Sequence, residues 1–418
     1  MKQLNGEQKK ETLNQVMKAI GAGALVSAAA AAAPAAAANF GDDLAFLQQR
    51  KDVVVLTDKA GLAKVALVAD WQGRVMTSTA GGDSGLSFGW INRQLIASGE
   101  VQPHINVFGG EDRFWLGPEG GQFSLFFAQG VPFDFDHWYT PAAIDTMPFK
   151  IVSKSKTSAK FSAAFSLTNY SGTVLDLKVL REVRLLAPKE AWKHLGLAEI
   201  PGVQMVAFES ENKITNAGRK PWTKQSGMVS VWILGMFNPS PLTTVVVPIR
   251  PGPESELGKA VTSDYFGNVP PERLVVKSNV IYFKADGQYR SKIGIGPKRS
   301  LGVLGSYDAA NRVLTLAQYT QPPGVTDYVN SLWKLQDDPF NGDVANSYND
   351  GPVAPGAKPL GPFYELESSS PAAALSPGKS LTHIHRTIHL IGSEEQLDAV
   401  AKAVLGVTLQ EIKNGLPK

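Results

Sequence analysis

The stretch "TVLDLKVLREVRLL" (residues 173–186) alternates apolar and charged side chains. Leu175 and Leu177 fall on one face of an extended chain, and Asp176 and Lys178 fall on the other. A period of two is typical of a β-strand with one buried and one exposed face. Because "NYSG" (169–172) supplies a turn immediately before it, the stretch predicts one arm of a β-hairpin.

Similar runs recur from Val53 to about Ile391, separated by turn-forming residues. They are "MVSVWILGMF" (228–237), "TTVVVPI" (243–249), "LVVKSNVIYFKA" (274–285), "RVLTLAQYT" (312–320), "GPFYELES" (361–368) and "LTHIHRTIHLIG" (381–392). Helix signals gather at the C-terminal end, where Ser393 with Gln396, and Thr408 with Glu411, fit capping boxes. Since no linker divides the body, residues 39–418 predict a single all-β domain of large antiparallel sheets with a short C-terminal helical tail.

Residues 1–38 differ in composition from the body. A polar, lysine-bearing start precedes "AIGAGALVSAAAAAA" (19–33) and then "PAAAA" (34–38). This order is typical of a secretory signal peptide cleaved after Ala38, which predicts export to the periplasm or the extracellular space. The alternative is a disordered alanine-rich leader. No other run approaches the ~20 apolar residues of a transmembrane helix, so we expect no membrane insertion after processing.

Charge and motifs exclude several function classes. The formal net charge is +3, which argues against the basic face that a nucleic-acid-binding protein needs. The absence of cysteine excludes disulfides, thiolate metal sites and a cysteine nucleophile. There is no phosphate-binding loop, dinucleotide fingerprint or HExxH motif, so the sequence predicts no cofactor and no metal.

The segment "PHINVFGGEDRFWLGPEGGQF" (103–123) concentrates hydrogen-bonding groups around a tryptophan. Sugar recognition uses this chemistry, with an aromatic face against the ring and carboxylates, amides and guanidinium groups for the hydroxyls. The alternative is a surface loop in which Arg113 pairs with Glu111 or Asp112. The candidate binding residues are His104, Asn106, Glu111, Arg113, Trp115 and Gln122, with Glu119 as a candidate acid.

A second polar segment is "YVNSLWKLQDDPFNGDVANSYNDGP" (328–352). Its irregular pattern predicts neither strand nor helix, and long polar loops in compact domains are often functional. The alternative is a turn-rich loop held by Asx hydrogen bonds. The candidate binding residues are Asn330, Trp333, Asn346, Asn349 and Asp350.

Two neighbouring strands near the C-terminus carry the remaining titratable candidates. Glu365 and Glu367 share one face of a strand, so each raises the pKa of the other and one becomes a candidate general base. In the next strand, the side chains of His383, His385 and His389 also share a face. We expect a polar or solvent-facing surface there, with metal binding as the less favoured alternative, because alternate strand residues lie ~6.5–7 Å apart.

The segment "FYELESSSPAAALSPGKSLTHIHRTIHL" (363–390) resembles the end of galactose mutarotase-like, or aldose 1-epimerase-like, proteins. The body resembles more closely the DUF6786 family within that superfamily, through four segments. These are "GGEDRFWLGPEGGQF" (109–123), "YVNSLW" (328–333), "GDVANSYNDGP" (342–352) and "ELESSSPA" (365–372). The resemblance implies a β-supersandwich of two broad antiparallel sheets whose concave face binds a mono- or oligosaccharide.

The same resemblance implies catalytic roles. In mutarotases, a glutamate before the last strand acts as base on the anomeric hydroxyl, which carries over to Glu367 and, second, to Glu365. A histidine in an "H-x-Y-F" segment acts as acid, but this chain has "SGMVSVWILGMFNPS" (226–240) in the central strands. Glu119 is a candidate second carboxylate facing Glu367, an arrangement suited to glycosidic-bond chemistry. Two functions stay open: an epimerase-like or glycoside-processing enzyme, and a non-catalytic carbohydrate-binding protein.

Overall fold

The computed structural model describes residues 39–353 and 356–417, so the predicted leader lies outside the described residues. The described chain forms three antiparallel sheets. In strand order, the ten-stranded large sheet contains β11 (Leu274–Val276), β12 (Val280–Lys284), β10 (Thr243–Pro248), β14 (Val303–Asp308), β15 (Val313–Tyr319), β18 (Ser380–Ile391), β8 (Gln204–Asn216), β7 (Val174–Leu185), β6 (Ser158–Thr168) and β5 (Lys150–Lys154). The five-stranded small sheet contains β13 (Ser291–Ile295), β16 (Ala345–Asn349), β17 (Tyr364–Ser369), β9 (Ser230–Phe237) and β4 (Arg113–Gly117). The third sheet contains β1 (Val53–Thr57), β2 (Lys64–Val68) and β3 (Arg74–Thr79).

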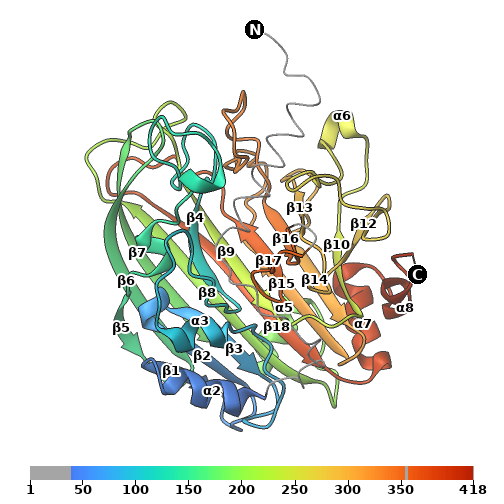
Figure 1. Cartoon of the computed structure of the whole chain (residues 1–418). Helices are drawn as coiled ribbons and strands as arrows, with labels where there is room; N and C mark the ends of the chain where they lie inside the picture. Colours follow the sequence, from blue (N-terminus) through green and yellow to red (C-terminus); the bar gives the residue numbers. More distant parts are fainter. Residues whose placement is uncertain (1–38, 354–355, 418) are drawn as a thin grey trace.

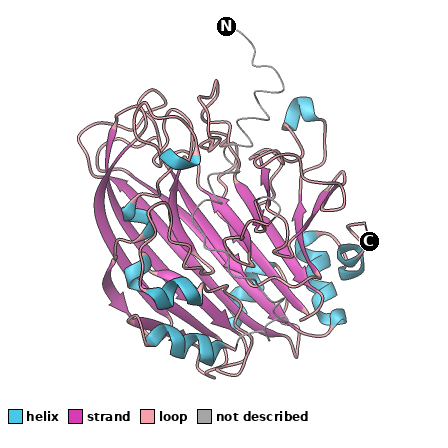
Figure 2. Cartoon of the chain, in the orientation of Figure 1, coloured by secondary structure: helices cyan, strands magenta, loops and turns pink. Residues whose placement is uncertain are grey.

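The helices are short and lie around the sheets (Figure 1 and Figure 2). They are α2 (Phe40–Gln48), α3 (Arg93–Ser98), α4 (Ala142–Asp145), α5 (Pro188–Leu195), α6 (Glu254–Leu257), α7 (Glu394–Leu405) and α8 (Leu409–Lys413), with 3-10 turns η1 (Ala69–Trp71) and η2 (Phe135–His137). Helix α7 contacts β14 and β10, and its Leu397 and Val400 belong to the same buried cluster as Leu316 of β15 and Ile388 of β18. The C-terminal helices therefore cover part of one face of the large sheet.

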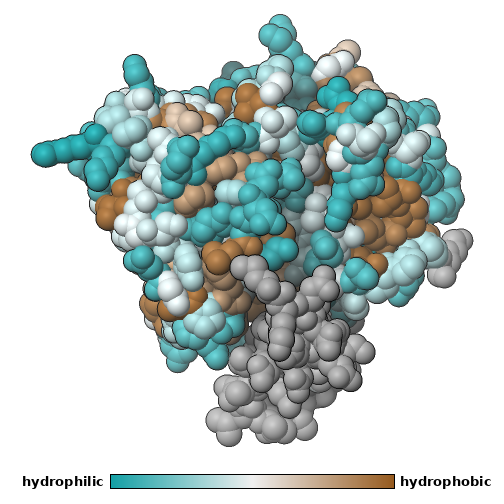
Figure 3. Space-filling model, turned by 90° about the horizontal axis from the view of Figure 1, so that it is seen from above, coloured by the Kyte–Doolittle hydropathy of each residue, from teal (hydrophilic) through white to brown (hydrophobic). Residues whose placement is uncertain are grey.

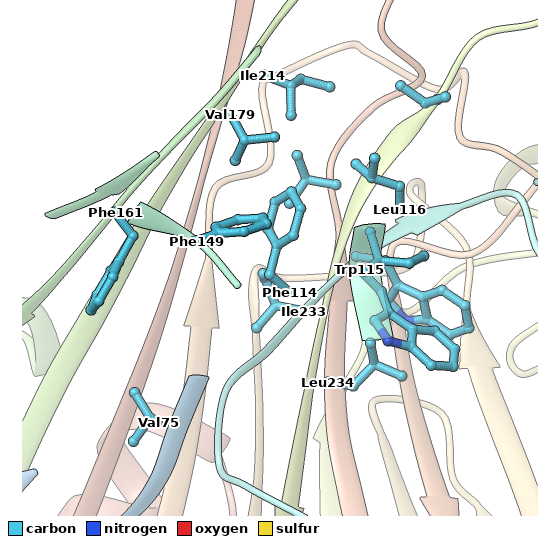
Figure 4. Close-up of a cluster of buried hydrophobic side chains, with 14 of the residues drawn as sticks. Val75, Phe114, Trp115, Leu116, Phe149, Phe161, Val179, Ile214, Ile233 and Leu234 are labelled. Carbon is cyan, nitrogen blue, oxygen red and sulfur yellow. The ribbon is translucent and has the colours of Figure 1, made fainter. Parts of the chain in front are cut away.

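The small sheet packs on the other face of the large sheet through an apolar core. Phe114 of β4 and Ile233 of β9 belong to the same buried cluster as Phe161 of β6 and Val179 of β7. Figure 4 shows Phe114 directed toward Phe149 and the large sheet, with Trp115 on the other side of β4. Because strand side chains alternate, each strand of the small sheet presents one set of residues to this core and the next set to its outer face, the face turned away from the large sheet.

The prediction of an all-β fold of large antiparallel sheets with a C-terminal helical tail is confirmed. The alternating stretch 173–186 contains β7, and its partner β6 precedes it across the predicted turn. Both predicted capping boxes are present, at Ser393 of α7 and Thr408 of α8. The run 274–285 differs from expectation, since it forms two strands, β11 and β12, that pair with each other.

Two further differences concern elements that the sequence did not indicate. The segment 328–352 contains a regular strand, β16, whereas its irregular polar pattern predicted none. Its polar side chains are tolerated because β16 is paired on both sides, with β13 and β17. Helix α2 was also not predicted, although Asn39 caps its first turn.

No helix among the described residues is long and apolar enough to cross a membrane. The surface seen in Figure 3 is hydrophilic over much of this view, with apolar residues in separate patches.

Candidate functional site

Glu365 and Glu367 project from β17 on the outer face of the small sheet. The alternate residues of β17 face the large sheet: Tyr364 hydrogen-bonds Ser306 of β14, and Ser368 hydrogen-bonds the imidazole of His383 in β18. A strand places successive side chains on opposite faces, so both glutamates point away from the large sheet. The sequence prediction that they share a face is confirmed.

The neighbouring strands bring further polar and aromatic residues to the outer face. Directly paired residues in antiparallel strands lie on the same face. Register pairs Asn346 with Glu367 and Tyr348 with Glu365 on one side of β17. Beyond them lie Lys292 of β13, Trp232 of β9, and Arg113 and Trp115 of β4.

Glu367 is fully buried and held by two donors. Trp232 Nε1 and Lys292 Nζ each lie 2.9 Å from its Oε2. Its Oε1 receives no hydrogen bond from an N–H or hydroxyl of the described residues. Lys292 therefore forms an ion pair with Oε2, and the carboxyl of Glu365 lies within hydrogen-bonding range of this carboxylate.

Glu365 lies beside this carboxylate and contacts Arg113, whose Nη2 is 3.1 Å from Oε1. Burial raises the pKa of Glu365 to about 8; the charge of Arg113 opposes this rise and the charge of Glu367 adds to it. A carboxyl with this pKa carries its proton at pH 7. The two glutamates therefore combine a proton donor and a proton acceptor on one strand.

Glu119 lies at the rim of this cluster. Its backbone N–H donates to Ser331 Oγ at 3.1 Å. Burial raises the pKa of its carboxyl, while the charge of Lys292 and a hydrogen bond from Trp333 oppose the rise and the charge of Glu367 adds to it. The structure thus brings Glu119 within electrostatic range of Glu367, as the sequence suggested.

The glycines of "GPEGGQ" (117–122) allow two loops to pack closely. A side chain at Gly120 would meet Leu332 O at 2.4 Å, and one at Gly121 would meet Gln336 Nε2 at 2.6 Å. Gln122 joins the same contact, since its Nε2 donates to Gln336 O and its Oε1 accepts from Gln336 N. Gln122 is therefore engaged in loop packing.

Asp343, from the polar segment 328–352, and Tyr265, which the sequence did not indicate, lie on the side of Lys292. The Tyr265 hydroxyl donates to Asp343 Oδ2 and accepts from Asn346 Nδ2, the latter at 3.1 Å. Burial raises the pKa of Asp343 to about 6, although Tyr265 and Lys292 oppose the rise. Lys292 Nζ lies 4.8 Å from the Trp232 ring centre and 5.7 Å from the Tyr265 ring centre.

Aromatic rings form one wall of the cluster. Trp115 meets Trp232 edge-on at 5.6 Å between ring centres and lies 5.2 Å from Phe126. Trp138 stacks on Trp333 at 5.7 Å. Indole rings therefore stand beside carboxylates and amides in this cluster.

Comparison with known proteins shows which family the chain belongs to. The sequence matches a family of unknown function, DUF6786, over residues 38–416. The chain belongs to the DUF6786 family. The membership predicted from the sequence is therefore confirmed, whereas a comparison with curated proteins finds no match.

Solved structures similar to this DUF6786 chain have low sequence identity. They include the Slr1438 protein from Synechocystis sp. PCC 6803, with 12% identity, a TM-score of 0.47, and coverage of 82% of this chain and 97% of that chain. A putative aldose 1-epimerase from Escherichia coli K12 has 14% identity and a TM-score of 0.46, with coverage of 81% and 98%. A galactose mutarotase-like protein from Lactobacillus casei ATCC 334 has 11% identity and a TM-score of 0.45, with coverage of 81% and 100%.

Several candidate residues of the DUF6786 chain lie beside the cluster and have structural contacts. His104 Nδ1 lies 2.6 Å from Trp138 O, and its ring stacks on Tyr139. Asn106 donates to Asp145 Oδ2 at 2.8 Å. Asn330 Oδ1 accepts from the backbone of its own loop. These contacts position the loops that border the outer face.

Other candidates lie away from the outer face. Glu111 is fully buried between the sheets, where its Oε2 lies 2.8 Å from His389 Nε2 and 2.9 Å from Ser78 Oγ. Asn349 faces the large sheet and accepts from Gly287 N at 2.8 Å. The prediction that Glu111 and Asn349 line a sugar cleft is therefore corrected. Successive side chains of an extended chain point to opposite faces, and both of these side chains point toward the interior between the sheets.

Asp350 follows β16 and is nearly fully buried. Its Oδ1 accepts from the Tyr348 hydroxyl at 2.6 Å, and its Oδ2 accepts from Gly361 N at 2.8 Å. Burial raises the pKa of Asp350, while the hydrogen bond from Tyr348 opposes this effect. Asp350 thereby fixes Tyr348, which lies on the outer face.

The histidines of β18 form a polar surface, which is one of the two expected alternatives, but this surface is buried, so the solvent-facing alternative is wrong. His383 Nε2 and His385 Nδ1 each lie 2.8 Å from Ser368 Oγ of the small sheet. Burial lowers the pKa of His383 to about 3 and that of His385 to about 4. The small sheet covers this face of β18, and its serine partners take the place of water. No group of three metal-ligating side chains occurs within the described ranges.

A cavity of about 1240 Å³ lies elsewhere in the molecule, between α2 and the ends of both sheets. Phe88, Trp90, Asp308 and His389 are among its lining residues, and none of the three candidate acids lines it. Glu119, Lys292, Tyr265 and Trp333, at the rim of the candidate site, are each partly exposed.

Proposed function

We propose that this protein binds a sugar on the outer face of the small sheet and performs acid/base chemistry at its anomeric carbon, as an aldose 1-epimerase does. The observation that carries the proposal is the glutamate pair of β17. One member is a carboxylate ion-paired with Lys292, and the other carries a proton at neutral pH. Indole rings and amides around the pair supply the contacts that a sugar ring requires.

The reaction needs only these two groups. Glu367 Oε1 accepts the proton of the anomeric hydroxyl while the bond between C1 and the ring oxygen breaks. The proton of Glu365 passes to the ring oxygen, which yields the open-chain aldehyde. Rotation about the C1–C2 bond and the reverse steps return the other anomer and restore both carboxyls. Glu365 thus takes the part of the histidine that is missing from "SGMVSVWILGMFNPS" (226–240).

Saturation transfer between anomers, measured by NMR on the purified full chain with a panel of hexoses and hexuronates, tests this proposal. We expect exchange above the buffer rate, and at least a ~100-fold loss of rate in Glu367→Gln with binding largely retained. Glu211→Gln, on the exposed face of β8, is the matched control and should leave the rate unchanged. Sugar binding without exchange in the wild type would contradict catalysis and leave a carbohydrate-binding protein.

Glycoside processing is the second candidate, because Glu119 lies in range of Glu367 across the rim. Two carboxyls on opposite sides of a bound sugar suit hydrolysis of a glycosidic bond. Release of reducing ends from oligosaccharides, lost in both Glu119→Gln and Glu367→Gln, would favour this reaction over epimerisation. Epimerisation by the β17 pair requires Glu367 and leaves Glu119 dispensable.

A further inference from the structure

Arg113 has more hydrogen-bond donors than the described chain satisfies. Its Nη2 donates to Glu365, but its buried Nε and Nη1 have no acceptor among the described residues. The indole Nε1 of Trp115 is also buried without an acceptor in this part of the chain. Burying unpaired donors costs free energy, which an acceptor on a ligand would recover.

These donors lie close together on the outer face. Arg113 Cζ is 4.3 Å from the centre of the Trp115 ring, and both residues lie on β4 two positions apart. In Figure 4 the Trp115 side chain lies on the side of β4 opposite Phe114, away from the large sheet. The free N–H groups of both residues therefore belong to the wall of the proposed sugar site.

Positive charge accumulates at the same place. Arg74 is buried nearby, and burial together with the charge of Arg113 lowers its pKa to about 9, while Asp145 opposes the shift. Burial also raises the pKa of both nearby acids, Glu365 and Asp145. Because Glu365 carries its proton at pH 7, its ion pair with Arg113 is weakened, and Asp145 is another acid within electrostatic range of the guanidinium group.

We infer that the sugar taken by this site is acidic: a hexuronate whose carboxylate accepts hydrogen bonds from Arg113 and Trp115. The inference rests on the proposed function, since it names the class of sugar that the same site binds. A carboxylate only accepts hydrogen bonds, and arginine is its preferred protein partner.

The order of residues on the outer face matches the order of groups around a hexuronate ring. Register places Arg113 and Glu367 opposite the same residue of β9, with Glu365 in contact with Arg113. In a hexuronate, the ring oxygen lies between the carbon that bears the carboxylate group and the anomeric carbon. A carboxylate at Arg113 therefore directs the ring oxygen to Glu365 and the anomeric hydroxyl to Glu367, the groups that the proposed reaction requires at those atoms.

Calorimetric titration of the full chain with D-glucuronate, D-galacturonate, D-glucose and D-galactose tests the inference. We expect at least one hexuronate to bind about tenfold more tightly than the matching hexose, since hydrogen bonds to charged groups are the stronger ones. Trp115→Phe keeps an aromatic ring but removes the indole N–H together with the pyrrole half of the ring system, so it should weaken hexuronate binding about tenfold and by more than it weakens hexose binding. Trp192→Phe, on the buried face of α5, is the control.

The outcomes separate the inference from the proposed function. Tighter binding of a neutral hexose would overturn the acidic-sugar inference and leave sugar binding intact. A hexuronate preference that both Trp115→Phe and Arg113→Lys leave unchanged would overturn the assignment to these two residues. Tighter binding of glucose 6-phosphate than of glucuronate would overturn the inference that the acidic group of the sugar is a carboxylate. Failure of all four sugars to bind, in a protein with normal cooperative unfolding, would overturn the proposed function itself.

Discussion

Lys292 Nζ and Glu367 Oε2 lie 2.9 Å apart, although the two residues stand on strands separated by β16. Neighbouring strands lie ~4.8 Å apart, so the lysine side chain crosses a whole strand to reach the glutamate. The glutamate side chain is fully buried, and that of the lysine is only 11% exposed. This ion pair joins the proposed base to a strand that is not its neighbour in the sheet.

Replacing Lys292 with Met should destabilise the fold. It leaves Glu367 as a buried carboxylate with Trp232 as its remaining donor, and breaking a buried pair costs about 3 kcal/mol. Urea unfolding measures the loss. Adding Glu367→Gln to this variant should recover part of it, with a coupling energy above ~1 kcal/mol. Additive losses would show that the two side chains do not interact.

Glu365 should make stability depend on pH. Its pKa in the fold is about 8, above the ordinary value of 4.5, so the folded protein holds a proton that the unfolded chain loses. The contribution of this group is complete below pH 4.5 and is lost as pH rises to about 8. The wild type should therefore lose stability relative to Glu365→Gln between pH 5 and 8, by up to ~1.4 kcal/mol per pH unit. A constant difference across this range would contradict the prediction.

His383 should act in the opposite direction. Its pKa is lowered from 6.5 to about 3, so the unfolded chain takes up a proton that the fold excludes. Stability is lost as pH falls through 6.5 toward about 3. The stability advantage of the wild type over His383→Gln should shrink as pH falls from 6.5 to 4 in chemical unfolding.

Export is tested by mass. Expression of the full chain in a Gram-negative host should give a periplasmic or secreted protein whose intact mass corresponds to a chain beginning at Asn39. The physical reason is the order of polar start, apolar run and small residues in residues 1–38. A full-length mass in the cytosolic fraction would contradict the prediction and favour the alanine-rich leader.

Local patterns predicted much of the fold. The alternation in β7 fixed a strand and its faces, yet Arg181 occupies the inner face among Leu177, Val179 and Val183. It is fully buried because Asp112 pairs with it, with Arg181 Nη2 and Asp112 Oδ1 2.6 Å apart. Asp112 lies far away in the sequence, so no local pattern could reveal this compensation.

The residues of the candidate site likewise fall into those that a local sequence pattern could reveal and those that it could not. Glu365 and Glu367 could be placed on one face because they are two residues apart in a single strand. Lys292 and Tyr265 were missed because "SKIGI" (291–295) and "TSDYFG" (262–267) carry no recognisable motif. They reach the site only through the pairing of β13 with β16 and the contact of Tyr265 with Asn346, both of which are set by the tertiary fold.

The polar contacts between the two sheets have a consequence for alignment. Apolar surfaces can slide over each other at little cost, because hydrophobic contact has no preferred direction. The polar contacts between the sheets do not allow such sliding. These contacts join Ser368 to His383 and His385, and Asp112 to Arg181. A small shift of one sheet would leave these buried donors and acceptors without partners. Ser368 is next to Glu367 in β17. The polar contacts that fix the alignment of the two sheets therefore also fix the position of the proposed base.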